Sequence, residues 1–218
     1  MTHIQDSKKS VANARALYYD FFAGFFLYEL LSERTDVILE QIKILKSNPL
    51  DEKDLIYFEN LEKEISNFGV ENIMQEYTRT FLLPFAIPNE HSPMPARSKG
   101  QVRENPQIML YLSHYTEGCL NGSGLLKART LIKQTNFRLN AETFKESEEH
   151  FGFLLLLMRY LLLSNDKEDN DALNEVLKEL VLPLGEYVAT ALLQKEDLHY
   201  YSSVGNLLRS FLIVEQSL

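Results

Sequence analysis

Apolar residues recur every three or four positions along almost the whole chain, which is the spacing that places them on one face of an α-helix. No segment combines alternating apolar and polar residues with the β-branched enrichment that strands show. The pattern therefore predicts an all-α protein. We expect a single helical, bundle-like domain over residues 1–218, with about nine helices.

Periodicity and helix-ending residues together predict the helix boundaries. The predicted helices cover about residues 8–32, 36–47, 51–67, 70–83, 106–117, 125–136, 144–164, a stretch from 172 past 185, and 202–214. The first is apolar on most sides, so we expect it at the centre of the core and not at a cofactor. The run FGFLLLLMRYLLL should be deeply buried, and the acidic run at 164–171 should be a solvated loop.

A proline-rich segment interrupts the helical pattern near the middle of the chain. Pro84, Pro88, Pro93 and Pro95 rule out a continuous helix, because proline lacks the N–H donor and clashes with the preceding turn. Apolar side chains between these prolines favour docking on the helices over free solvation. Residues 84–104 are therefore expected to be a hinge between two helical halves or a loop over one bundle.

The charge of the chain restricts the classes of partner. The formal net charge is −9 and the pI is about 5.1, so nucleic acid and anionic membrane surfaces would be repelled and a basic peptide attracted. The apolar segment 16–31 is interrupted by Asp20 and Glu29 and is shorter than the roughly 20 residues that span a bilayer. We expect no nucleic-acid partner and no stable membrane insertion.

The single cysteine, Cys119, excludes an intramolecular disulfide and any multi-cysteine metal or iron–sulfur site supplied by one chain. The N-terminal residues lack the basic-then-apolar order of a signal peptide. Both features favour a reducing compartment, so the expected location is cytoplasmic.

Residues that could carry catalysis or bind metal are few and scattered. Glu196 and His199 form one Glu-x-x-His pair, whereas carboxylate-bridged metal sites in helical bundles use two. His114, Glu117 and Cys119 lack the spacing of a zinc site. We predict no metal, no cofactor and no catalytic residue, so the protein should not be an enzyme.

Two segments resemble the motifs of one protein family. Glu76-Tyr77, followed by Phe81, Pro84 and Pro88, resembles the E-Y-x-x-L-F-x-x-P-x-x-x-P signature of the TorD/DmsD/NarJ-type redox-enzyme maturation chaperones. Thr80 stands where that family usually has leucine.

The second segment is FKESEEHFGFLLLLM, at 144–158. It is similar to the family's E-x-x-D-H-L-x-x-E-L-x-F-M segment, with Glu146, His150 and Met158 at matching positions and Glu149 in place of the usual aspartate. The two motifs occur in the order that the family shows.

The resemblance implies a cytoplasmic chaperone without catalytic activity. Such a protein binds the twin-arginine signal peptide of a molybdenum- or tungsten-containing oxidoreductase and holds the apoenzyme until cofactor insertion is complete. The expected partners are the apo-molybdoenzyme catalytic subunit and its twin-arginine leader peptide, and the chaperone itself would be a monomer or a domain-swapped dimer. Two alternatives stay open: a helical adaptor that recognises no signal peptide, and a small helical hydrolase or metal-dependent enzyme that uses His91, His114 or His150.

A twin-arginine leader joins basic residues to an apolar stretch, so its receptor needs an apolar groove rimmed by carboxylates. The residues expected to form this site are Tyr77, Phe81, Pro84, Phe85, Pro88, Glu90, His91, Glu146, Glu149 and His150. Residues 84–100 should form a wall of the groove that responds to the client. Tyr77 and Phe81 could instead be core residues, and Glu149 with His150 could pin the proline-rich segment by hydrogen bonds.

Overall fold

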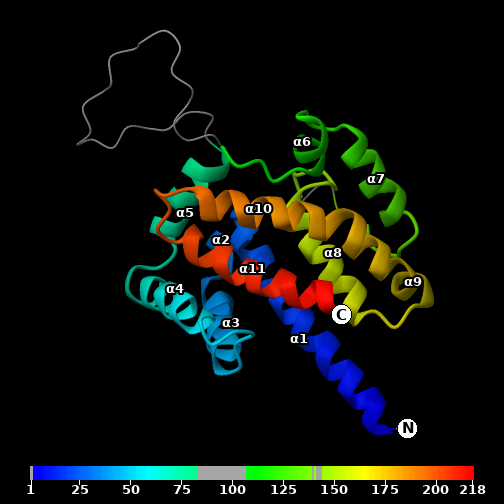
Figure 1. Ribbon diagram of the computed structural model, residues 1–218, viewed down its shortest axis with the longest axis horizontal. Helices are drawn as coiled ribbons and strands as arrows, with labels where there is room; N and C mark the ends of the chain where they lie inside the picture. The colour runs from blue at the N-terminus through cyan, green and yellow to red at the C-terminus, as the bar shows by residue number, and fades with distance from the viewer. Residues whose placement is uncertain (1, 83–106, 139, 141–143) are drawn as a thin grey trace.

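The computed structural model describes residues 2–82, 107–138, 140 and 144–218. In these residues the chain is helical, and the only strand-like pairing is an isolated antiparallel bridge between Tyr111 and His150 (Figure 1). The predicted all-α fold is confirmed. None of the described helices is both long and apolar enough to cross a membrane.

The helices follow the predicted order along the chain. Up to residue 82 they are α1 (Thr2–Phe26), α2 (Tyr28–Glu33), α3 (Thr35–Ser47), α4 (Asp54–Phe68) and α5 (Glu71–Tyr77), which continues as the π-helical segment η1 (Thr78–Leu82). From residue 107 they are α6 (Leu112–Glu117), α7 (Ser123–Ile132), α8 (Phe151–Leu163), α9 (Lys167–Val176), the π-helical segment η2 (Leu177–Val181), α10 (Leu182–Gln194) and α11 (Tyr201–Ser217).

The first predicted helix is two helices in the structure. Leu27 has an extended backbone, with φ −124° and ψ 117°, and it separates α1 from α2. The apolar periodicity continues across this residue, so the sequence pattern does not reveal the break. The side chain of Leu27 is buried beside Gly152 at the start of α8.

The helix predicted from residue 106 onward is wrong in its first half. Residues 107–110 are extended, and α6 begins only after them. The Ile108 N–H donates to the carbonyl oxygen of Thr80 at 2.9 Å. This bond ties the stretch to a distant segment, and local periodicity does not report it.

Two helix starts in the C-terminal part also differ from the prediction. α8 begins later than expected, because His150 has an extended backbone and caps the helix. α9 begins at Lys167, inside the acidic run that was expected to be a solvated loop. Asp169 in this run is buried, and its carboxylate accepts a hydrogen bond from the Asn136 N–H at 2.8 Å. The acidic run is therefore anchored to the turn after α7.

The C-terminal half of α1 lies at the centre of the molecule, as its apolar pattern predicts, while its first turns extend beyond the other helices (Figure 1). The side chains without exposed surface in this half include Tyr19, Phe21, Phe22, Phe25 and Phe26. Burial on every side requires several neighbouring helices. Among its neighbouring helices, α1 makes its largest contact with α8.

α8 runs antiparallel to α1. Near one end of the pair, Arg159 Nε lies 3.2 Å from Asp20 Oδ1. At the other end, a Cβ atom on Gly152 would lie 2.5 Å from Leu27 Cγ and 2.9 Å from the carbonyl oxygen of Phe26. Since a side chain at this position would meet backbone as well as side-chain atoms, glycine permits the close approach of the two helices.

One buried carboxylate joins the N-terminal and C-terminal parts of the fold. Glu76 in α5 accepts hydrogen bonds from the N–H groups of His199, Tyr200 and Tyr201 at 2.9, 2.9 and 2.6 Å. The first N–H groups of a helix lack partners within the helix, and the helix dipole favours negative charge there. Glu76, the first residue of the Glu76-Tyr77 motif, therefore caps α11.

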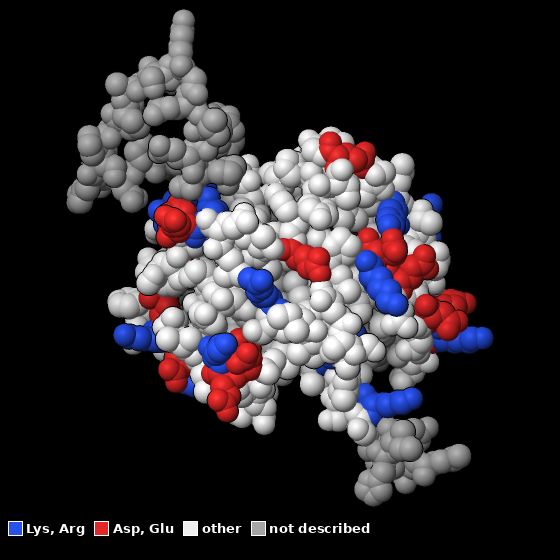
Figure 2. Space-filling view, viewed as in Figure 1, with Lys and Arg blue, Asp and Glu red and all other residues white. Residues whose placement is uncertain are grey.

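Charged side chains of both signs are interspersed over the face of the molecule that Figure 2 shows. Ion pairs such as Lys127 with Glu179 and Arg129 with Glu148 also place opposite charges next to each other. The net charge of −9 therefore does not form a single acidic surface on this face.

The substitution Gly152→Ala is expected to lower the free energy of unfolding by about 1–3 kcal/mol, because its methyl group overlaps Leu27 and the Phe26 carbonyl. Urea denaturation followed by circular dichroism measures the change. Gly24→Ala is the matched control: its Cβ would lie 3.3 Å from the Ile38 side chain, and alanine favours the helix by about 1 kcal/mol. Equal destabilisation by both substitutions would contradict the role assigned to Gly152.

The substitution Glu76→Gln should lower the free energy of unfolding by about 1–3 kcal/mol, because the amide keeps one acceptor for three N–H donors. Thermal and urea denaturation would both report the loss. Glu71→Gln changes the same charge at an exposed position of the same helix and should have the smaller effect. If the two variants are equally stable, Glu76 does not cap α11.

Candidate functional site

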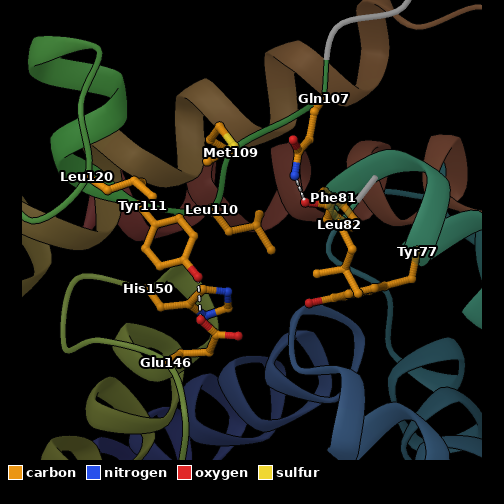
Figure 3. Close-up of a pocket in the computed structure, with 10 residues that line it drawn as sticks. All are labelled: Tyr77, Phe81, Leu82, Gln107, Met109, Leu110, Tyr111, Leu120, Glu146 and His150. Atoms are coloured by element: carbon orange, nitrogen blue, oxygen red, sulfur yellow. Dashed lines mark hydrogen bonds between the residues drawn. The ribbon is translucent and has the colours of Figure 1, made fainter. Parts of the chain in front are cut away.

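A partly open pocket of about 180 Å³ lies between η1 and the start of α8 (Figure 3). One wall is Tyr77, Phe81 and Leu82, and the other is Gln107, Met109, Leu110 and Tyr111, with Leu120, Glu146 and His150 completing the lining. We call this the Tyr111 pocket. Four of the residues predicted from the sequence meet here: Tyr77, Phe81, Glu146 and His150.

The first wall is held by the end of α1. Because α1 ends at Phe26, its last carbonyl groups lack partners within the helix. The Tyr201 hydroxyl donates to the Phe25 carbonyl at 2.6 Å, and the Tyr77 hydroxyl donates to the Phe26 carbonyl at 3.4 Å. The Phe81 ring packs at 4.9 Å from that of Tyr77 and at 5.0 Å from that of Tyr201. Tyr77 and Phe81 are thus both core residues and pocket wall.

The second wall is the extended segment 107–111. Its Leu110 carbonyl accepts a hydrogen bond from the Phe151 N–H at 2.7 Å, which fixes it to the start of α8. The Gln107 side chain donates to the Phe81 carbonyl, as Figure 3 shows, and so joins the two walls. An extended chain points alternate side chains to opposite sides, so Met109 and Tyr111 share one side.

The polar corner of the pocket contains Tyr111, Glu146 and His150. The Tyr111 hydroxyl donates to the Glu146 carboxylate, and the His150 ring lies 5.0 Å from the Tyr111 ring (Figure 3). Burial and then the hydrogen bond to Glu146 raise the pKa of Tyr111. The hydroxyl therefore stays protonated and acts as a donor to Glu146.

His150 is buried and caps α8. Its Nδ1 accepts a hydrogen bond from the Gly152 N–H at 3.2 Å. Burial lowers the pKa of His150 to about 3, so the ring is neutral at physiological pH. Since Nδ1 is an acceptor, the proton of the neutral ring is on Nε2.

Glu149 has no exposed surface and does not line the Tyr111 pocket. Its two carboxylate oxygens accept hydrogen bonds from the N–H groups of Ser113, at 2.6 Å, and Asn121, at 2.9 Å. Glu149 therefore holds the start of α6 and the turn after it. Its neighbour Glu148 is paired with Arg129.

The remaining predicted site residues are Pro84, Phe85, Pro88, Glu90 and His91, and they lie outside the described residues. The same holds for the expectation that residues 84–100 form a wall that responds to the client. Both stay predictions.

Sequence reasoning missed the second wall and Leu120. The alternation over 107–111, where Ile108 and Leu110 are buried and the residues between them are partly exposed, is visible only in the structure, because Met109 and Tyr111 are not polar. The helical spacing of the same apolar residues concealed it. Leu120 stands in a glycine-containing turn, where an apolar residue gives no periodic signal.

The chemistry of the Tyr111 pocket favours binding of a side chain over binding of a cofactor. Its volume of about 180 Å³ is below the roughly 300–1,000 Å³ of small-molecule sites. Within the described part of the chain, no group of three His, Cys, Asp or Glu residues could hold a metal ion. Apolar walls with one carboxylate are suited to part of a peptide.

Comparison with known proteins agrees with the resemblance found in the sequence. Residues 100–189 match the family model described as nitrate reductase delta subunit. The match covers less than half of the chain and supports a redox-enzyme maturation chaperone of the NarJ type. That family serves molybdoenzyme assembly and is not a family of catalytic enzymes. The predictions of a chaperone of this type and of a protein that is not an enzyme are confirmed. Neither the curated proteins nor the solved structures that were compared gave a significant match.

Acid should destabilise the fold through His150. Its pKa is about 3 in the folded protein and about 6.5 when unfolded. As the pH falls from about 6.5 toward 3, the unfolded state therefore binds a proton that the folded state does not. The substitution His150→Asn keeps an N-cap acceptor but removes the titrating group. As the pH falls, the free energy of unfolding of the variant should therefore decrease less steeply than that of the wild type. The two slopes should differ by up to about 1.4 kcal/mol per pH unit. Urea denaturation from pH 7 to 4 tests this, and parallel curves would contradict it.

Proposed function

We propose that this chaperone binds the twin-arginine leader peptide of a molybdenum- or tungsten-containing oxidoreductase at the Tyr111 pocket. It does so in the cytoplasm and holds the apo catalytic subunit until cofactor insertion is complete. The observation that carries this proposal is the combination, in one pocket, of aromatic and aliphatic walls with a single carboxylate from Glu146.

The mouth of the pocket supports binding of an extended partner surface. Leu82 and Leu120 line the pocket, and each is 48% exposed. Tyr28, whose ring lies 5.5 Å from that of Tyr77, extends the exposed apolar surface on the side of α2. Apolar side chains that gather around a pocket are typical of an interaction site. A leader peptide supplies the apolar stretch that would cover them.

The binding test uses fluorescein-labelled twin-arginine leader peptides from formate dehydrogenase, nitrate reductase and S- or N-oxide reductase catalytic subunits. One of them should bind with a micromolar or lower Kd, more tightly than its scrambled copy, and the Kd should rise with salt because screening weakens exposed ion pairs. A helical adaptor without leader recognition would bind each leader and its scrambled copy equally.

Leu120→Asp should weaken binding of that leader by about tenfold or more, because it places a charge where apolar surface is covered. The control is Leu126→Asp on α7, which is 66% exposed and does not line the pocket, and it should leave the Kd unchanged. Fluorescence anisotropy measures both. If the two variants bind alike, the leader occupies another surface.

A further inference from the structure

The charges of the described residues that line the Tyr111 pocket are not balanced. Glu146 is acidic, His150 is neutral, and none of the described residues that line the pocket is lysine or arginine. Two further carboxylates act on the pocket from outside the lining. These are Glu29 and Glu149. Burial raises the pKa of Tyr77 most, and the charges of Glu146 and Glu29 raise it further. The charge of Glu149 contributes in the same way to the raised pKa of Tyr111. The field in the pocket therefore favours a cation.

The walls are suited to the aliphatic stem of a basic side chain. Tyr77, Phe81 and Tyr111 contribute aromatic rings, and Met109 and Leu110 contribute aliphatic surface. Basic side chains bury their methylene stems on apolar surfaces while the charged group stays near polar partners, and aromatic faces attract the charged group itself. The small volume of the pocket restricts the occupant to about one such side chain.

An uncharged apolar occupant would be the poorer choice for this pocket. It would displace water from Glu146 without replacing the hydrogen bonds of the carboxylate, and a charged group that loses water without a partner is destabilised. The Tyr111 hydroxyl supplies one hydrogen bond, whereas a carboxylate can accept about four. A cation would satisfy the remaining acceptor sites and neutralise the charge.

We propose that the Tyr111 pocket takes one arginine side chain of the bound peptide, with its stem between Tyr77 and Leu110 and its guanidinium group on Glu146. Arginine suits the site better than lysine, because its planar group stacks on aromatic rings and is less strongly hydrated. Glu146 is then the residue that determines specificity. This inference rests on the proposed function, since the arginine belongs to the leader peptide.

The test is a thermodynamic cycle between Glu146 and each arginine of the leader that binds. Wild-type protein and Glu146→Gln are titrated with the leader and with copies in which one arginine at a time is glutamine. Glu146→Gln should weaken binding of the native leader by about 10- to 100-fold. It should weaken binding of one substituted copy, the copy that lacks the arginine bound to Glu146, by less than about twofold. Glu175→Gln, an exposed carboxylate on α9 outside the pocket, controls for net charge.

A second measurement uses wild-type protein alone, in case Glu146→Gln unfolds. A leader with citrulline in place of that arginine keeps the shape and loses the charge, so it should bind about tenfold or more weakly, while citrulline at the other arginine has a smaller effect. The inference is overturned if the leader binds specifically but no arginine couples to Glu146, or if citrulline is tolerated at every position. A leader that binds no better than its scrambled copy would overturn the proposed function as well.

Discussion

The close contact between the end of α1 and the start of α8 positions both walls of the site. Gly152 allows the two helices to approach, and the Phe26 and Phe151 rings pack at 5.0 Å across the contact. Because α1 ends there, its carbonyl groups are available to Tyr77 and Tyr201, and these tyrosines hold the first wall of the pocket. Because α8 begins there, the N–H group of its first residue, Phe151, donates to the Leu110 carbonyl and holds the second wall. The pocket is therefore a consequence of two helix ends meeting in the core.

Several acidic residues serve the interior and not the surface. Glu76 caps α11, Glu149 holds the start of α6, and Asp169 holds the turn after α7. Each carboxylate satisfies N–H groups that a helix or turn leaves without a partner. The net charge of the chain therefore includes carboxylates that stabilise the interior and do not face solvent.

Part of the site was predictable from the sequence. Tyr77, Phe81, Glu146 and His150 were chosen from motifs, and they line one pocket although they lie far apart in the chain. Glu149, chosen with them, does not line the pocket, because adjacent residues at a helix start point in different directions. The second wall was not predictable, since Met109 and Tyr111 fit a helical pattern and are held extended by hydrogen bonds to distant backbone groups.

The sequence by itself determined the all-helical class, the central position of α1 and the resemblance to maturation chaperones. Periodicity and capping residues act within a few turns of one chain segment, so they can be recognised directly in the sequence. The tertiary structure alone decided that α1 breaks at Leu27, that residues 107–110 are extended and that Glu146 faces the pocket while Glu149 does not. Each of these outcomes depends on hydrogen bonds and packing between residues that are distant in the sequence, and local pattern does not encode such partners.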